Sequence, residues 1–395
     1  MTIKNGDISN DTNLESTPTE LSFDTVPDSP ELKEKVSEIK KVLETEDKKN
    51  VHIFCNLAKS FGGIVSDDLR REIWPALLEL DPCKADPQPD QELLESHPEY
   101  KQVVLDVNRS LKRFPPGIPY AKRVALQDQL TRLILRVISK YPHLRYYQGY
   151  HDVAVTFLLV VGEDVAFQIM ERLSTDHLRP CMEPTMEKTS HLLNYIYPLI
   201  HRLHPALCDF IERSGVGTMF CLPWFLTWYG HSLNQYRDVV RLYDYFLASP
   251  PMLPLYLAAA IVVYRQEEIF TCDCDLASVH CLLSQLPDDL PFEKLLKEAS
   301  ELYENFPPES VETEVEERSR REAEKCAEET RQRALVRRRQ NNERNRHILD
   351  LWRQWLRIPI HNPRTKYKLL IVTASVAFGI YAYLRSSGQP GELTL

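Results

Sequence analysis

Glycine is scarce in this chain: 12 of its 395 residues are glycine, whereas 27 are proline. Few glycines, together with long stretches of helical apolar periodicity, favour helices joined by proline-marked turns. We find no alternating apolar and polar run bounded by hairpin turns, the pattern that a β-sheet would leave. Hydrophobic residues make up 43% and charged residues 27%, as in globular proteins. The sequence therefore predicts an all-α protein.

The chain also has no excess of positive charge, and we expect no secretory leader from its opening residues. Its formal net charge of -9 argues against nucleic acid as a main partner. The 9 cysteines are scattered and odd in number, and the opening residues, MTIKNGDISN, are polar. These features predict a reduced body that faces the cytosol.

Motifs for binding a nucleotide or a metal are missing as well. We find no Walker A loop, no G-x-G-x-x-G and no nucleophile elbow, so the chain should not bind or hydrolyse a nucleotide by itself. TCDCDLASVHC brings together Cys272, Cys274, His280 and Cys281, but C-x-C spacing and an adjacent His-Cys pair suit zinc poorly. We expect buried or semi-buried free thiols there and no metal.

Composition changes along the chain mark its organisation. The first residues, rich in Asp, Glu, Ser, Thr and Pro, cannot bury enough apolar surface to become ordered. We divide the chain into a disordered acidic N-terminus with a lead-in helix (1–50), a helical body (51–308), a charged helical segment (309–358), a basic linker (359–368), an apolar run (369–384) and a short tail (385–395).

Apolar residues with helical spacing fill the body. LQDQLTRLILRVISKY places Leu126, Leu130, Leu133, Ile134 and Val137 on one helical face. PLYLAAAIVVYRQEEIF is apolar nearly all round at its start, which predicts a buried helix. Further apolar helices are predicted at VAVTFLLVVG, VAFQIMERLS, LLNYIYPLIHRL and VVRLYDYFLA.

The charged segment is acidic first and basic later, with Arg337, Arg338 and Arg339 in its basic half. Pairs of Glu and Arg four residues apart favour a solvated helix, and a coiled coil lacks its apolar seam. The basic stretch could contact anionic lipid or could simply be solvated.

The apolar run LLIVTASVAFGIYAYL, residues 369–384, predicts a single membrane-spanning helix, although it is slightly shorter than the usual span of about 20 residues. Lys366, Lys368 and Arg385 flank it, and tyrosines lie near both of its ends. The alternative is a buried core helix. The preceding basic residues place the body in the cytosol, and the position near the C-terminus predicts a tail anchor suited to a thin bilayer such as the endoplasmic reticulum.

Two short motifs suggest phosphoryl-transfer chemistry. VVLDVNRSLKRFPPG carries Arg109, with Asp106 on the same helical face to orient or neutralise it, and YYQGYHD carries Gln148 followed by Gly149. An arginine can offset charge that develops on a transferred phosphate, and a glutamine can orient the attacking water. Each residue alone would more often be structural.

These motifs resemble a known family. GGIVSDDLRREIW, the D-x-x-R element at Asp106 and Arg109, and the Y-x-Q-G element at Tyr146, Gln148 and Gly149 look like TBC domains, the Rab GTPase-activating proteins. The match runs in order over most of residues 51–308. WFLTWYGHSLNQYRDVVRLYDYFLA resembles a later motif of the family, in which many members have Trp-Asp where this chain has Tyr243-Asp244.

The resemblance implies an all-α fold and a dual-finger mechanism, with Arg109 as the arginine finger and Gln148 as the glutamine finger. Asp106, Tyr146 and Gly149 would support them. The partner would be a GTP-bound Rab, which would bring its own GTP and Mg²⁺. With the tail anchor, the chain is similar to an endoplasmic-reticulum member of the family that is directed at Rabs of early secretory traffic.

Other residues and functions stay open. Arg70 and Trp74 are interpreted as structural, in a helix-surface pair and in the core. His151 and Asp152 are interpreted as structural or partner-facing, and Arg113 is a weaker candidate for partner contact. The chain could instead be a catalytically silent scaffold that binds GTPases or tethers, or a membrane-anchored adaptor. The sequence does not decide the preferred Rab or the oligomeric state.

Overall fold

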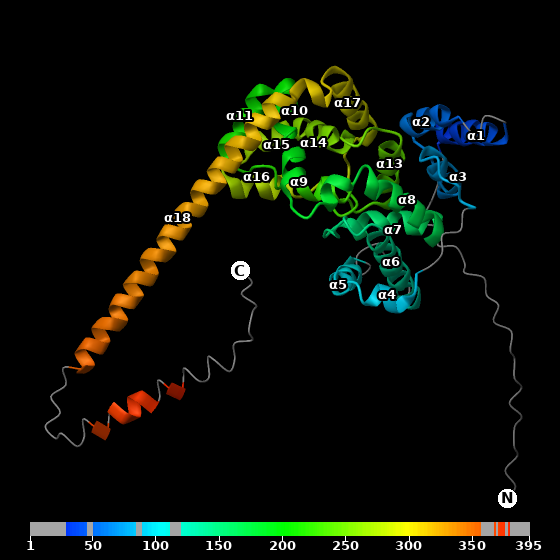
Figure 1. The fold of residues 1–395 in the computed structure, drawn as a ribbon. Coiled ribbons are helices and arrows are strands. Elements are labelled where there is room, and N and C mark those ends of the chain that lie inside the picture. Colours follow the sequence, from blue (N-terminus) through cyan, green and yellow to red (C-terminus); the bar gives the residue numbers. More distant parts are fainter. Residues whose placement is uncertain are drawn as a thin grey trace, which may run out of the picture. The chain divides into compact units, whose positions relative to one another are not determined.

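The computed structural model describes residues 29–45, 50–83, 89–110, 120–356, 367–368, 370–375 and 378–379. Within these residues the regular structure is helical and no β-strand occurs, so the all-α prediction is confirmed (Figure 1). The elements are α1 (Pro30–Glu44), α2 (Val51–Lys59), α3 (Asp67–Leu77), α4 (Gln91–Glu95), α5 (Tyr100–Ser110), α6 (Tyr120–Lys140), α7 (Tyr150–Val161), α8 (Glu163–Thr175), the 3-10 helix η2 (Arg179–Met182), α9 (Glu187–Leu193), α10 (Ile196–Leu203), α11 (Pro205–Ser214), α12 (Leu222–Leu226), α13 (Tyr236–Leu247), α14 (Leu253–Tyr264), α15 (Gln266–Thr271), α16 (Leu276–Leu283), α17 (Phe292–Asn305) and α18 (Pro308–Leu356).

The chain forms two compact units, Met1–Arg320 and Arg321–Leu395. In the first unit, α14 is surrounded by other helices, among them α10, α12, α15 and α17. The ten residues from Leu253 to Val262 are all buried. A helix that is apolar on every side is stable only inside a protein, so the predicted burial of this segment is confirmed.

A second buried helix, α7, positions the candidate site. It packs against α3, α5, α6 and α8. Nine of its twelve residues are buried, among them Phe157 and Val160. Because α7 is held on several sides, the turn that precedes it has a fixed place beside α5.

An aromatic cluster joins the elements around α7. The rings of Trp74 and Phe157 lie 5.2 Å apart, and Tyr243 lies 5.2 Å from Phe157. Trp228 packs edge-on against Tyr243 at 5.4 Å and against Phe246 at 5.5 Å. Each ring buries a large apolar area, and edge-to-face pairs add about 0.5–1.5 kcal/mol. The cluster therefore fixes α3, α7 and α13 relative to one another.

A fully buried carboxylate on α13 holds the start of the body together. Asp244 accepts hydrogen bonds from Arg70 at 3.0 Å, from the Trp74 indole at 2.8 Å and from the Ile64 amide at 3.0 Å. Gly63 must be glycine, since its φ is +60° and a Cβ would lie 2.6 Å from the Asp244 carboxylate. Trp74 is in the core, as predicted. Arg70 is 3% exposed and pairs with Asp67 on α3 as well as with Asp244, so the helix pair is present, but the expectation that it lies on the surface was wrong.

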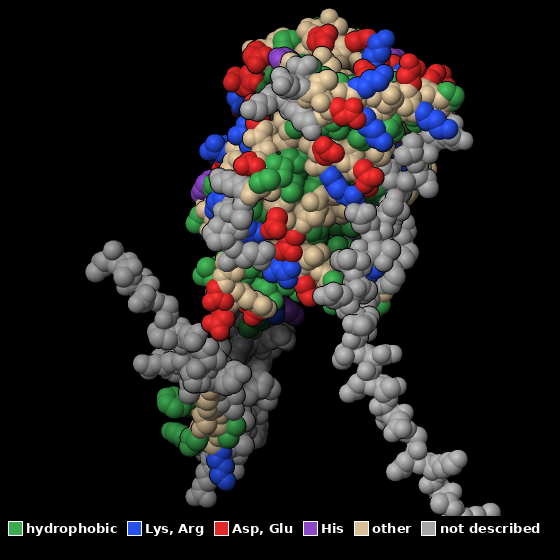
Figure 2. Space-filling model, turned by 90° about the vertical axis from the view of Figure 1, so that its right-hand side faces the viewer, with side chains coloured by type: hydrophobic (Ala, Val, Ile, Leu, Met, Phe, Trp, Pro, Cys, Tyr) green, Lys and Arg blue, Asp and Glu red, His purple; other side chains and the backbone are tan. Residues whose placement is uncertain are grey.

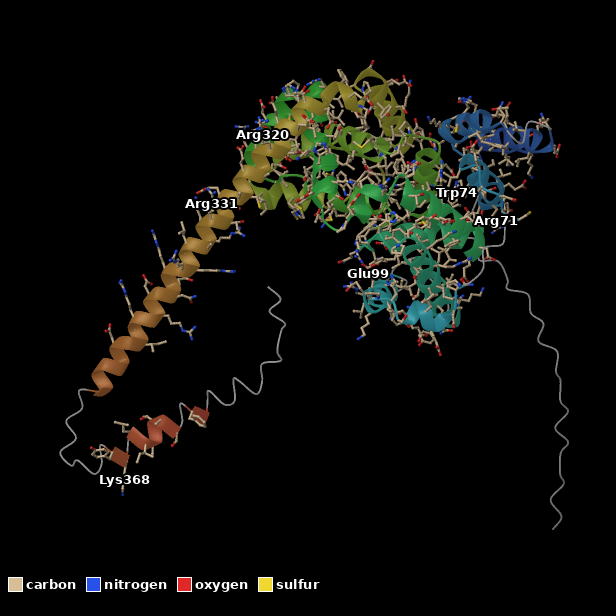
Figure 3. The ribbon with its side chains drawn as sticks, in the orientation of Figure 1. Arg71, Trp74, Glu99, Arg320, Arg331 and Lys368 are labelled. Carbon is tan, nitrogen blue, oxygen red and sulfur yellow. The ribbon has the colours of Figure 1, made fainter. Side chains whose placement is uncertain are left out.

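Helices at both ends of the first unit pack onto it. The predicted lead-in helix is present as α1, with Ile39 and Leu43 buried. The first turns of α18 bury Val311 and Val315, whereas residues 320–341 are exposed. The solvated helix predicted for the charged segment is thus found beyond the first turns, and Figure 3 shows the side chains around Arg331 pointing outward.

The structure does not add support for a membrane span. Among the described residues, no helix is both long and apolar enough to cross a bilayer. Of the predicted span, residues 370–375 and 378–379 are described, and Leu370 and Phe378 are 67% and 71% exposed. Figure 2 shows hydrophobic and basic side chains on the described part of the C-terminal segment. The anchor over 369–384 stays a prediction. The predicted disordered tail falls almost entirely on residues outside the described ranges.

Replacing the buried carboxylate tests its structural role. Asp244→Ala should lower the free energy of unfolding by about 3–5 kcal/mol, because it removes two hydrogen bonds of the buried Arg70 guanidinium and the acceptor of the Trp74 indole and the Ile64 amide. Asp68→Ala is the matched control, since Asp68 is 84% exposed and pairs with Arg71 on the surface, and we expect a change within about 0.5 kcal/mol. Urea unfolding of the full chain, followed by tryptophan fluorescence, measures both. A loss below about 1 kcal/mol at Asp244 would contradict this role.

Candidate functional site

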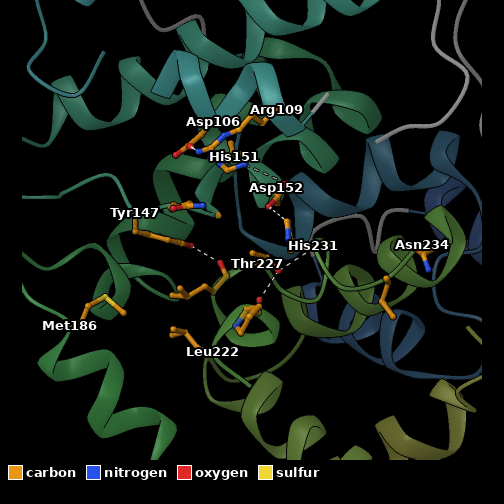
Figure 4. A pocket seen from close by; sticks show the side chains of 16 residues that line it. Asp106, Arg109, Tyr147, His151, Asp152, Met186, Leu222, Thr227, His231 and Asn234 are labelled. Carbon is orange, nitrogen blue, oxygen red and sulfur yellow. Dashed lines mark hydrogen bonds and ion pairs between the residues drawn. The ribbon is translucent and has the colours of Figure 1, made fainter. Parts of the chain in front are cut away.

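A cavity of about 780 Å³ lies in the first unit and contains most of the residues that the two motifs single out (Figure 4). One wall comes from α5 and from the turn that leads into α7, and the opposite wall comes from α12 and the turn after it. The lining residues are Asp106, Arg109, Tyr147, Gln148, Gly149, His151, Asp152, Met186, Leu222, Pro223, Leu226, Thr227, Gly230, His231, Leu233 and Asn234.

Arg109 stands in the last turn of α5 with its side chain 64% exposed. Asp106, one turn earlier, has a side chain with no exposed surface and accepts a hydrogen bond from the Arg109 guanidinium. The spacing of three residues places both on one helical face, as predicted. Asp106 thus holds one side of the guanidinium and leaves the rest open to the cavity.

Tyr146 makes a further hydrogen bond to the carboxylate of this pair. Its hydroxyl lies 3.1 Å from Asp106 Oδ2 and 2.8 Å from His151 Nδ1. Burial, with a contribution from Asp106, raises the pKa of Tyr146 well above its ordinary value, so the phenol stays protonated. Burial also lowers the pKa of His151 below its ordinary value. His151 is therefore a buried, neutral member of the network, in keeping with its structural interpretation.

Gln148 precedes α7 in the second motif. Its side chain is exposed on the cavity wall, and no hydrogen bond joins it to another described residue. Gly149 follows with φ of +111°, which a residue with a side chain rarely adopts. Thr227 of the same chain approaches this glycine, and a Cβ at Gly149 would lie 2.9 Å from the Thr227 methyl group.

The opposite wall contains residues that the sequence did not single out. His231 Nδ1 lies 3.0 Å from Asp152 Oδ2, so its N–H can donate a hydrogen bond to that carboxylate across the cavity, and the His231 side chain is 54% exposed. Trp228 and Tyr229, just before it, have positive φ values of 46° and 67°. Such values are costly for aromatic residues and persist only where packing imposes them. Here both side chains are buried, so their packing in the core holds the turn in this conformation.

This geometry can present a guanidinium and a carboxamide to a ligand that covers the cavity. Both groups stand on the wall made by α5 and the turn before α7, with a buried carboxylate fixing the first.

Comparison with known proteins agrees with the fold and the motifs. The model of the Rab-GTPase-TBC domain matches residues 67–270, more than half of the chain. The chain is a member of this family. It is also 50% identical over 276 residues to TBC1 domain family member 20 of Homo sapiens, covering 70% of this chain and 68% of that protein. The resemblance to TBC-domain Rab GTPase-activating proteins, and to this member among them, is therefore confirmed.

More distant relatives and solved TBC structures extend the match. The GTPase-activating protein gyp10 of Schizosaccharomyces pombe is 30% identical over 276 residues, which cover 68% of this chain and 71% of that protein. The crystal structure of the Ypt/Rab-GAP domain of Gyp1p superposes with a TM-score of 0.58, covering 70% of this chain and 99% of that domain at 14% identity. At that identity, the structural match supports the TBC fold alone.

The thiols that the sequence singles out do not line the cavity. Cys272 is half-buried, but Cys274 and Cys281 are exposed, so the expectation of buried or semi-buried thiols holds for the first only. Arg113 lies outside the described residues, and its contact with a partner stays a prediction.

The close approach at Gly149 gives a test of how the turn is held. Gly149→Ala should destabilise the TBC domain more than Gly215→Ala. Both glycines have positive φ, but space is open around Gly215. We expect a loss of roughly 1–2 kcal/mol at Gly215 from backbone strain alone. The loss at Gly149 should be larger because the new methyl group also meets Thr227. Urea unfolding of the two variants checks this, and an equal or smaller loss at Gly149 would contradict it.

Proposed function

We propose that this chain stimulates GTP hydrolysis by a Rab GTPase and that it supplies Arg109 and Gln148 in trans. One observation carries the proposal: the two exposed side chains, from separate elements, line the same cavity. In this arrangement the guanidinium offsets charge on the transferred phosphate, and the carboxamide orients the attacking water.

In the proposed reaction the nucleotide is bound by the partner GTPase and not by this chain. The Rab brings GTP and Mg²⁺, and the TBC domain needs no cofactor of its own. Asp106 and Tyr146 orient the arginine, and Gly149 shapes the turn that carries Gln148. An arginine finger is worth roughly 10³ to 10⁵ in rate, or about 4–7 kcal/mol of activation free energy.

We also propose that residues 369–384 anchor the chain in the endoplasmic reticulum membrane, with the TBC domain in the cytosol and the last residues in the lumen. The uncharged run and its basic flanks support this, as does the similarity to TBC1 domain family member 20. The Rabs that it meets would then be those of early secretory traffic between the endoplasmic reticulum and the Golgi.

Removing either finger should abolish most of the stimulation. In single-turnover GTP hydrolysis with a panel of purified Rabs, the wild-type chain should accelerate one or a few of them. Arg109→Ala should lower the stimulated rate by roughly 10³-fold or more. Arg109→Lys should rescue poorly, because lysine lacks the planar fork of donors. Gln148→Ala should also lose most of the stimulation.

The matched control is Arg237→Ala. Arg237 is 67% exposed on α13 and does not line the cavity, so its loss should leave the rate unchanged. If a folded wild-type chain stimulated no Rab, a catalytically silent scaffold would become the better account. Full activity of Arg109→Ala on a stimulated Rab would reject the arginine finger.

The anchor can be tested in cells. The full chain should stay with membranes after carbonate extraction, and a variant without residues 369–384 should be released. An N-x-S/T acceptor added at the C-terminus should be glycosylated, whereas one added at the N-terminus should not be. The control is a deletion of equal length within the acidic N-terminus. Release of the intact chain by carbonate, or an unmodified C-terminal acceptor, would contradict the proposed anchor.

A further inference from the structure

The buried carboxylate of Asp106 has more partners than the arginine that it holds. One oxygen accepts from Arg109. The other lies 3.1 Å from Gln102 Nε2 and 3.1 Å from the Tyr146 hydroxyl. An ionised carboxylate can only accept hydrogen bonds, so the single proton of the Tyr146 hydroxyl points at Asp106. The phenol oxygen can then act only as an acceptor towards any other neighbour.

That other neighbour is His151. Its Nδ1 lies 2.8 Å from the Tyr146 oxygen, and the residue is 6% exposed. Because the tyrosine proton is already used, Nδ1 must carry the hydrogen of the neutral ring. The hydrogen-bond network thus assigns the tautomer. The other ring nitrogen, Nε2, lies 3.6 Å from Asp152 Oδ1.

We propose that His151 is a positioning residue for the arginine: its Nδ1–H orients the Tyr146 hydroxyl, which fixes the Asp106 carboxylate that holds Arg109. This inference rests on the proposed function of Arg109. His151 reaches neither the nucleotide nor the Rab in this account, and it acts only through the two residues between it and the guanidinium.

The arginine needs such support because of its position. Asp106 is buried, but the Arg109 side chain is 64% exposed, and an ion pair with so exposed a partner does not by itself fix a long side chain. The final torsion of an aspartate is also broad, so the carboxylate plane has to be set by its hydrogen-bond donors. Tyr146 and Gln102 set that plane, and the hydrogen bond that His151 Nδ1–H donates holds the Tyr146 oxygen in place.

Two amide substitutions distinguish this role from simple packing. In His151→Asn the amide nitrogen is bonded to Cγ, as Nδ1 is in histidine, so a donor to Tyr146 remains. In His151→Gln the amide stands one carbon further out, near the position of Nε2, and that donor is lost. We expect the Gln variant to lower the stimulated kcat roughly tenfold with little change in KM for the Rab, and the Asn variant to stay within about threefold. His201→Gln, on the exposed side of α10, controls for the substitution itself.

A double-mutant cycle tests whether the effect passes through Tyr146. If it does, adding His151→Gln to Tyr146→Phe should change kcat by less than about twofold, because Tyr146→Phe already removes the hydroxyl that connects His151 to Asp106. Equal losses in the Asn and Gln variants, or independent effects of the two substitutions in the cycle, would overturn the proposal.

A readout without a GTPase keeps the two proposals separate. The ¹⁵N shifts of the His151 ring in the full chain should show the proton on Nδ1, and the Arg109 guanidinium signals should show faster rotation in His151→Gln than in wild type. A proton on Nε2 alone would overturn the positioning role. If the wild-type chain stimulated no Rab, the catalytic proposal would fail, and these spectra would still decide whether His151 orders the arginine.

Discussion

The rest of the first unit depends on the hydrogen bonds and the ion pair of the Asp244 carboxylate. It is completely buried, and it accepts four hydrogen bonds from Arg70, Trp74 and the Ile64 amide. A charge in this environment is tolerated only because its counter-charge and donors are in place. These partners come from α3 and the turn before it, and Asp244 comes from α13, so one carboxylate joins segments that lie about 180 residues apart. Trp74 then begins the aromatic cluster against which α7 packs.

These packed helices determine which side chains are presented to the cavity. The turn before α7 carries Gln148, and α5, which packs on α7, carries Arg109. The two groups that would act on a nucleotide are therefore held by helices whose buried faces are fixed, while their own side chains remain exposed. The opposite wall is fixed differently, by the turn in which Trp228 and Tyr229 adopt positive φ. Backbone strain of this kind is tolerated when buried side chains hold it in place, and it commonly accompanies functional surfaces.

The sequence predicted what depends on local periodicity and motif spacing. The buried character of α14 follows from its all-round apolar composition, and the pairing of Asp106 with Arg109 follows from three-residue spacing on a helix. Contacts between distant segments were not predictable in this way. Nothing near Arg70 in the sequence indicates that Asp244 on α13 will pair with it, and nothing near Gly149 indicates that Thr227 will approach it. His231 was missed for the same reason, since its place in the cavity depends on how α12 packs.

The central claim is that Arg109 and Gln148 act together on the nucleotide of a Rab. The most direct measurement is a crystal structure of this chain bound to a responsive Rab that carries GDP and aluminium fluoride, which imitates the phosphoryl group in transit. The account predicts that the Arg109 guanidinium contacts the fluoride group and that the Gln148 carboxamide lies within hydrogen-bond distance of the in-line water, while Asp106 and Tyr146 keep their contacts. A complex in which the Rab's own glutamine holds that water, with Gln148 turned away, would contradict it.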